Sequence, residues 1–424
     1  GALDPLDLCE SVLSAIQASP LSDRIYARVT TERALSEAEA AKLRAKRGQR
    51  LGPLDGVPAS WKDLFDSAGD GTEAGTALLQ GRVPLKDAKV LARAGALGLV
   101  CLGKTHMSEL AFSGLGLNPV TATPPCLNDA DAVSGGSSSG AAASVAFGLA
   151  PAAIGSDTGG PVRSPSAWND LGGFNPTHGA LPLDGAVPLC SHFDTVGPLT
   201  RSVEDAAALF STMGGPPRID LDGTSLAGAR LLVLENVAFE DIEDTPLIAF
   251  EGAVERLQAK GAIVERGAVD DVEHAMATWP QLFAPEAYAI WGDTIEANPD
   301  VMFPQIRERF RGGRDVKATE YLSAWRTVNC ARLGYHEQTA RYDAVIVPTA
   351  PIMPPNVHRL LSDQDYYVRA NLLALRNTRI GNLLGLCAVP LPTGVPSAGI
   401  MFFGGAGSAA RLLRLAKAAE AALG

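Results

Sequence analysis

The sequence predicts an α/β fold in which a β-sheet carries helices on both faces. Short apolar segments typical of buried strands alternate with longer segments of helical periodicity, and this alternation favours a sheet that is covered on both sides. The composition, 46% hydrophobic and 20% charged, is that of an ordinary folded protein. No linker-like segment divides the 424 residues, so we expect a single domain over 1–424.

The N-terminal part of the chain is expected to supply three helices and two strands. Residues 4–19 have apolar side chains at helical spacing, and Pro20 follows as a stop signal. Residues 32–47 are rich in Ala, Glu, Lys and Arg, as in an exposed helix. The other expected elements are a strand that ends at Lys62, a helix over 88–94 and a buried strand over 99–102.

The C-terminal half repeats the alternation. An apolar strand over 230–234 precedes a helix that Thr245 caps and Gly261 ends, and another strand begins at Ile263. Aromatic side chains and long polar helices indicate a helical excursion at about 270–340 that covers one end of the sheet. The last expected elements are strands within 342–351, 382–392 and 399–403, and a helix over 408–423.

Two Ser/Gly-rich loops joined by an apolar connector form the candidate functional segment, Ser134–Pro165. Clustered glycines let backbone N–H groups approach a ligand, because glycine has no Cβ. The connector, Ala141–Ile154, carries no charge and is too short to cross a membrane. We interpret it as a buried helix that fixes one loop against the other. The alternative is a flexible linker, but a linker rarely carries a core helix in its middle.

Charge and cysteine usage restrict the partners and the compartment. The net charge of −11 argues against nucleic acid and anionic membranes, which both need a basic surface. Six scattered cysteines without a C-x-x-C pair indicate free thiols in a reducing compartment. We find neither a signal peptide nor the roughly 18 apolar residues of a membrane span, and therefore expect a cytoplasmic protein.

Metal and nucleotide sites are not expected. The six histidines show no ligand spacing with the cysteines. Residues 98–105, G-L-V-C-L-G-K-T, match the phosphate-loop pattern. Their spacer residues are strand-like, however, so we interpret the two glycines as the ends of a strand.

The segment P-L-D-G-V-P-A-S-W-K-D, with G-G-S-S-S-G and G-S-D-T-G-G downstream, resembles the amidase signature family. The likeness is strongest over about 51–220. It implies a mixed central sheet flanked by helices on both faces. It also implies a catalytic group made of a lysine, a serine on a cis peptide and a nucleophilic serine. The matching positions are Lys62, Ser137 and, directly after the glycine pair of the second loop, Pro161.

The resemblance implies that a neutral lysine is the base in acyl transfer. A serine hydroxyl is a poor nucleophile until a base removes its proton, and a lysine is such a base when burial lowers its pKa. Ser137 would relay the proton to Lys62, while Asp157 and Arg163 would hold the second loop in shape. The residues expected to contact the oxyanion or the substrate are Thr158, Gly159, Gly160, Ser138, Met107 and Phe112.

Pro161 departs from the family pattern. Proline has no hydroxyl to attack a carbonyl and no N–H to donate, and loss of a nucleophile lowers the rate by several orders of magnitude. A rescue requires Ser137, Ser138 or Ser164 to attack from a displaced position, and such a displacement costs about a hundredfold. Asn175 is a second departure, because the family typically carries a lysine there.

The resemblance thus implies an amidase-type hydrolase, impaired by Pro161, that cleaves the C–N bond of a small, moderately apolar carboxamide without a cofactor. The alternative is a non-catalytic amidase-like protein that binds a ligand or a partner subunit through the same cleft. The family includes a tRNA amidotransferase branch, but no residue of this sequence marks a contact with tRNA. A homodimer is left open.

Overall fold

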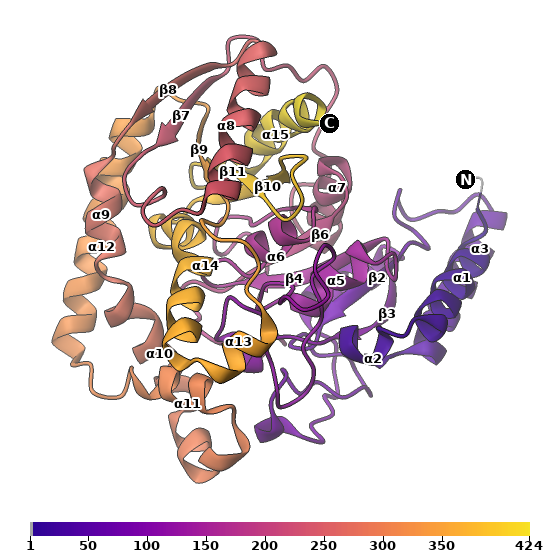
Figure 1. The fold of residues 1–424 in the computed structure, drawn as a ribbon. Coiled ribbons are helices and arrows are strands. Elements are labelled where there is room, and N and C mark those ends of the chain that lie inside the picture. Colours follow the sequence, from indigo (N-terminus) through magenta and orange to yellow (C-terminus); the bar gives the residue numbers. More distant parts are fainter. Residues whose placement is uncertain (1–2) are drawn as a thin grey trace.

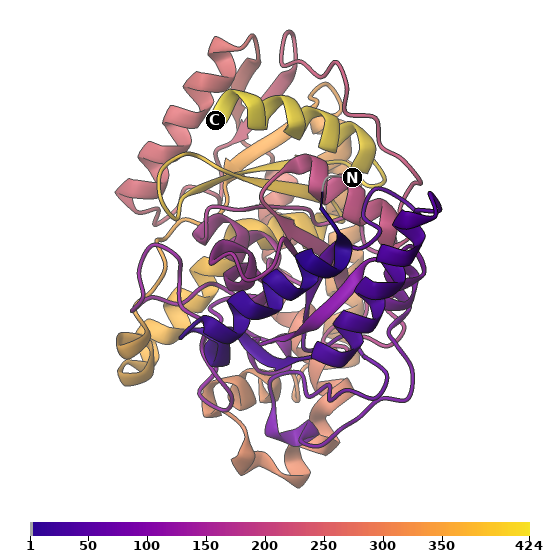
Figure 2. The same cartoon turned by 90° about the vertical axis from the view of Figure 1, so that its right-hand side faces the viewer.

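The computed structural model describes residues 3–424 and contains two β-sheets with helices packed against them (Figures 1 and 2). The strands are β1 (Tyr26–Val29), β2 (Pro58–Lys62), β3 (Val100–Thr105), β4 (Ala152–Asp157), β5 (Gly172–Gly173), β6 (Thr195–Thr200), β7 (Arg230–Leu234), β8 (Ile263–Gly267), β9 (Ala344–Pro348), β10 (Cys387–Pro392) and β11 (Gly399–Gly404). The strand orders are β1-β3-β2-β4-β6-β5 and β10-β11-β9-β7-β8. Each sheet mixes parallel and antiparallel neighbours.

The helices surround these sheets. They are α1 (Pro5–Ala18), α2 (Ser22–Ile25), α3 (Thr31–Lys46), α4 (Lys89–Ala96), α5 (Ser139–Ala146), α6 (Arg163–Trp168), α7 (Val203–Met213), α8 (Asp244–Ala259), α9 (Asp270–Met276), α10 (Trp279–Ala297), α11 (Pro304–Arg311), α12 (Ala318–Thr339), α13 (Val357–Ser362), α14 (Gln364–Leu384) and α15 (Ala409–Leu423). Short 3-10 helices cover Ala77–Leu79, Glu109–Ala111 and Pro299–Val301. In Figure 1, α1 and α3 lie on one side of the molecule and α9–α12 on the opposite side.

The two sheets meet edge to edge. Asn175, just beyond β5, and Ala388 in β10 exchange two backbone hydrogen bonds of 2.9 and 2.8 Å. The predicted α/β class with a mixed, helix-flanked sheet is confirmed, with the refinement that the sheet has two parts. One hydrophobic cluster extends from Ala59 to Leu423 and includes strands of both sheets. This shared core supports the single domain, which stays a prediction.

Most predicted elements are present, including the helical excursion, which consists of α9–α12. The connector Ala141–Ile154 is an exception: it is not one helix. Helix α5 ends at Ala146, Gly148 adopts a left-handed φ of 73°, and β4 begins at Ala152. Glycine followed by proline in the sequence G-L-A-P stops the helix, and the last residues of the connector pair with β2 and β6 instead.

The predicted strand over 382–392 is also partly wrong. Helix α14 continues to Leu384 and ends at Gly385, whose φ is 70°, and only Cys387–Pro392 form a strand. The glycine that follows the last helical turn is a typical C-terminal cap, because it adopts this left-handed conformation without strain. The consequence for the site is that Asn382 lies on a helix.

Candidate active site

Lys62 is the centre of the candidate site. It is the last residue of β2, and its side chain is completely buried. Its Nζ donates hydrogen bonds to Ser137 Oγ at 2.6 Å and to Ser156 Oγ at 2.8 Å. The predicted proximity of Lys62 and Ser137 is therefore present, and Ser156 is an additional partner that sequence reasoning missed.

The topology of the first sheet explains why these three residues meet. Strands β2 and β4 are parallel neighbours, with Trp61 opposite Ile154, so their carboxyl ends bring Lys62 and Ser156 to the same edge. Ser137 arrives from the loop before α5, where the Gly136–Ser137 peptide bond is cis. The carbonyl of Ser137 accepts a hydrogen bond from the Ser108 N–H at 3.1 Å, which attaches the loop to the neighbouring segment.

Burial determines the protonation of the lysine. It lowers the pKa of Lys62 to about 7, an effect that the charges of Asp157 and Asp194 partly oppose. The ammonium and the neutral amine are thus both accessible near neutral pH. A neutral amine can accept a proton from Ser137, whereas an ordinary surface lysine cannot at this pH.

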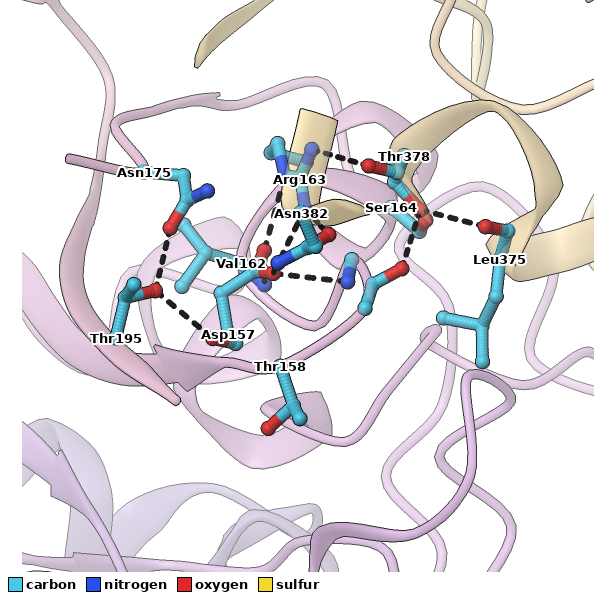
Figure 3. A network of polar contacts seen from close by, with 12 residues as sticks. Asp157, Thr158, Val162, Arg163, Ser164, Asn175, Thr195, Leu375, Thr378 and Asn382 are labelled. Atoms are coloured by element: carbon cyan, nitrogen blue, oxygen red, sulfur yellow. Dashed lines mark hydrogen bonds and ion pairs between the residues drawn. The ribbon is translucent and has the colours of Figure 1, made fainter. Parts of the chain in front are cut away.

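Asp157 organises the second Ser/Gly-rich loop (Figure 3). Its carboxylate accepts hydrogen bonds from the backbone N–H groups of Gly160 at 2.8 Å and Val162 at 3.0 Å. It also forms a fully buried ion pair with Arg163 at 2.8 Å and accepts from Asn382 Nδ2 at 3.0 Å. Burial opposes ionisation of Asp157, but the adjacent guanidinium outweighs it, so the pKa lies below its usual value. Both oxygens of the Asp157 carboxylate therefore hold the loop.

This arrangement limits the backbone donors of the loop. The N–H of Gly160 is committed to Asp157, and Pro161 has none. Thr158 and Gly159 remain as the donors of a predicted oxyanion hole. Thr158 is fixed by its side chain, whose Oγ1 donates to Asp194 Oδ1 at 2.5 Å.

Comparison with known proteins agrees with this geometry. A family model described as Amidase matches residues 7–413. The chain belongs to the amidase family. The members of this family are hydrolases that act on C–N amide bonds.

Relatives cover nearly the whole chain. It is 34% identical over 410 residues to a 2-amino-5-chloromuconic acid deaminase of Comamonas testosteroni, over 92% of this chain and 87% of that protein. It is 30% identical over 432 residues to a glutamyl-tRNA(Gln) amidotransferase subunit of Symbiobacterium thermophilum, over 93% and 88%. A solved structure described as an amidase superposes with a TM-score of 0.89 at 30% identity, over 100% of this chain and 97% of that one.

Of the three serines considered as substitute nucleophiles of this amidase-family chain, Ser138 and Ser164 make no hydrogen bond with Lys62. Ser138 Oγ donates to the carbonyl of Ser156 at 3.2 Å, and Ser164 Oγ donates to the carbonyl of Ala374 in α14 at 2.9 Å. Both side chains are completely buried. Neither hydroxyl therefore contacts the base, and Ser137 and Ser156 are the two that do.

Asn175, where the family typically carries a lysine, belongs to the packing around the loop. Its Oδ1 lies 2.5 Å from Thr195 Oγ1, which also lies 2.8 Å from the carbonyl of Asp157 (Figure 3). The Asn175 amide is thus connected to the loop through the hydroxyl of Thr195. It does not replace the charge of a lysine.

Two cavities contain residues considered for the site, and only the smaller is lined by residues of the reactive segment. The smaller, about 170 Å³, is lined by Ser156, Thr158 and Asp194 together with apolar side chains. Burial raises the pKa of Asp194 to about 6, although Thr158 and two backbone N–H groups donate to it. The larger, about 380 Å³, includes the predicted contact residue Phe112. Met107, also predicted to contact substrate, instead lies in the hydrophobic core and lines neither cavity.

The structure also bears on the ligand classes set aside above. Lys104 of the phosphate-loop match is a buried residue of strand β3 that donates to Thr72 Oγ1 at 2.9 Å and to the carbonyl of Phe65, so it is not available to phosphate. Within residues 3–424, no group of three His, Cys, Asp or Glu side chains is placed to hold a metal ion. No helix in this range has the length and apolarity needed to cross a bilayer.

Proposed function

We propose that this site is the proton relay of an amide hydrolase whose nucleophile position, 161, is occupied by proline. The hydrogen bond of 2.6 Å between Lys62 Nζ and Ser137 Oγ carries the proposal, because the lysine is buried and its pKa lies at about 7. Ser137 would take the proton of a hydroxyl at position 161 and pass it to the neutral amine. The N–H groups of Thr158 and Gly159 would stabilise the oxyanion.

In this chain the attacking group is missing while the relay is present. Ser138 and Ser164 donate their hydroxyls to backbone carbonyls, which argues against rescue by either. We therefore propose that hydrolysis of small carboxamides by this chain is impaired. No cofactor enters the reaction, because acyl transfer to a serine requires only a base and an oxyanion hole.

Ammonia release tests this function. Pro161→Ser should hydrolyse at least one member of a panel of small primary amides at least about a thousandfold faster than the unmodified chain. Pro161→Ala is the matched control and should match the unmodified chain. Equal ammonia release by all three proteins would contradict the proposed role of position 161.

Pro161 also favours a second candidate, a non-catalytic protein that binds a ligand or partner subunit through the same cleft. The likeness to one subunit of an amidotransferase supports the partner-subunit form of this candidate. It predicts that Pro161→Ser gains no hydrolysis although the fold is unchanged. A cytoplasmic location and a homodimer stay predictions from the sequence and the family.

A further inference from the structure

Arg379 is a buried cation without an anionic partner in the described part of the chain. Its side chain lies in helix α14 and is 4% exposed, and its Nη2 makes no hydrogen bond within residues 3–424. The ring of Trp279 covers the guanidinium, with the Cζ atom 4.5 Å from the ring centroid. Burying a guanidinium without a hydrogen-bonding anion is unfavourable. A side chain in this state is suited to an anionic ligand.

Arg309 of helix α11 is a second arginine without a carboxylate partner in the described chain, and its side chain is half-buried. It lines the cavity of about 380 Å³, stacks on Phe112 with its Cζ atom 4.5 Å from the ring centroid, and pairs with no carboxylate of residues 3–424. Its neighbours on the same helix differ: Arg307 and Arg311 both pair with Glu308, at 3.1 and 2.9 Å. The carboxylate of Glu308, which also lines the cavity, is therefore already engaged.

The two guanidinium groups are linked by Trp279, which covers Arg379 and lines the same cavity as Arg309. Burial, and then repulsion by Arg309, lower the pKa of Arg379 to about 9, and burial lowers the pKa of Arg309 to about 10. Both groups are nevertheless charged at neutral pH. An anion between them would relieve the repulsion and supply the missing hydrogen-bond acceptors.

The cavity that Arg309 lines is built for a small amphipathic molecule. Its walls include the rings of Phe112, Trp279, Phe283 and Tyr367, which leave room for an apolar body. Gln305, also in the wall, has an Oε1 atom that is buried and makes no hydrogen bond within the described chain. Unpaired polar groups in an apolar cavity are the usual means of orienting a ligand.

Helix α14 joins this cavity to the reactive loop. Arg379 directly follows Thr378, whose Oγ1 donates to the carbonyl of Gly159 at 2.8 Å. Residues three and four apart share a helix face, and those neighbours of Arg379 both contact the loop. Leu375 packs against Gly160, and Asn382 donates to Asp157 at 3.0 Å. An anion held by Arg379 thus lies on the side of α14 that faces the proposed oxyanion hole.

We propose that Arg309 and Arg379 together bind a carboxylate of the substrate, so that the site takes small amides that carry a free carboxyl group. The guanidinium groups would bind the carboxylate, the aromatic walls the carbon chain, and the loop around Gly159 the amide carbonyl. The assignment of the amide end rests on the proposed function. The assignment of the carboxylate end does not, because binding requires no turnover.

Calorimetric titration of the unmodified chain tests the carboxylate end. The ligands are the monoamides of malonic, succinic, glutaric and adipic acid, each with its diamide, which differs only in the missing charge. At least one monoamide should bind about tenfold or more tightly than its diamide. Inorganic phosphate should compete weakly or not at all. If no monoamide exceeds its diamide, or if phosphate binds more tightly than every monoamide, the proposal is overturned.

Variants identify the residues. Arg379→Gln and Arg309→Gln should each weaken binding of the preferred monoamide about tenfold or more and leave its diamide unchanged. Arg311→Gln, on the same helix but paired with Glu296 and Glu308, is the control and should change neither. Arg379→Lys keeps the charge if the glutamine variant fails to fold, and should retain part of the preference. Unchanged monoamide binding in both glutamine variants would overturn the assignment.

The two proposals fail separately. A preference for monoamides without ammonia release by Pro161→Ser would remove the hydrolase and keep the carboxylate site. Ammonia release by Pro161→Ser from neutral amides at the same rate as from the monoamides would keep the hydrolase and remove the carboxylate site.

Discussion

At the scale of single residues, the site depends on an amine that has been removed from water. Lys62 has no carboxylate of residues 3–424 as a hydrogen-bond partner, and its two acceptors are neutral hydroxyls. Burial therefore destabilises the ammonium form, and the charges of Asp157 and Asp194 offset this only in part. The pKa of Lys62 consequently lies at about 7. Under the proposed function, Pro161 leaves this base intact and removes only the hydroxyl that would use it.

The pH dependence of acylation follows from this pKa. In Pro161→Ser, the rate of reaction with a serine-directed fluorophosphonate should rise with pH and level off, with a midpoint at about 7. The sign follows because the neutral amine, which accepts the proton, is the form present above its pKa. Rates measured from about pH 5.5 to about pH 9.5 check this, and a midpoint near the ordinary lysine value would contradict it.

A second residue should move that midpoint. The negative charge of Asp194 raises the pKa of Lys62, so removing the charge should lower it. Asp194→Asn keeps an acceptor for the N–H groups of Leu189 and Cys190 and loses the charge. In the Pro161→Ser background, this variant should shift the midpoint below that of its parent. An unchanged or higher midpoint would show that Asp194 does not act on the lysine.

At the scale of elements, helix α14 and the second Ser/Gly-rich loop form one unit. Asn382 and Thr378 of the helix contact the loop, and Arg163 reaches back to the carbonyl of Thr378 at 2.6 Å (Figure 3). The Asp157–Arg163 pair lies at the centre of this unit with no access to water. Such a pair is costly to break from one side, because the remaining charge stays buried.

Arg163→Met should therefore destabilise the protein by about 3–5 kcal/mol. Methionine fills part of the volume but leaves the carboxylate of Asp157 without its cation. Guanidinium chloride unfolding of the variant and the parent measures the difference. Asp157→Asn combined with Arg163→Met should recover part of the loss. A single-variant loss below about 1 kcal/mol would show that the pair does not stabilise the fold.

The end of α14 offers a backbone test. Gly385 has a φ of 70°, and an added Cβ would meet no atom closer than 3.5 Å. Gly385→Ala should thus cost about 1 kcal/mol through backbone strain alone. Gly95→Ala, inside helix α4 at an ordinary φ and with open space around it, should instead stabilise by about 0.5–1 kcal/mol. Equal effects of the two substitutions would contradict this interpretation of the helix end.

At the scale of the whole molecule, the sequence motifs predicted the local parts of the site better than the long-range ones. Lys62, Ser137 and the Asp157–Gly160 loop were identified because each lies in a short recognisable pattern. Ser156 was missed because its role depends on the parallel pairing of β2 with β4. The engagement of the Gly160 N–H by Asp157 was missed because it depends on local backbone geometry.

The same limit explains the errors in the fold. A run of small apolar residues such as Ala141–Ile154 suits a buried helix and a buried strand equally well, so periodicity did not locate the boundary at Gly148. Arg309 and Arg379 belong to helices α11 and α14, and each looks like a surface residue in isolation. Only the packing of the helical excursion against α14 shows that Arg379 is buried and Arg309 half-buried, each beside an aromatic ring.

The central claim is that Lys62 and Ser137 can still accept a proton and that Pro161 alone prevents acylation. Intact-mass measurement after exposure to a fluorophosphonate tests it most directly. Pro161→Ser should gain one adduct, located at position 161 by peptide mapping, while the unmodified chain and Pro161→Ser combined with Lys62→Met should gain none. An adduct on the unmodified chain at Ser137, Ser138 or Ser164 would contradict the claim, and so would the absence of an adduct on folded Pro161→Ser.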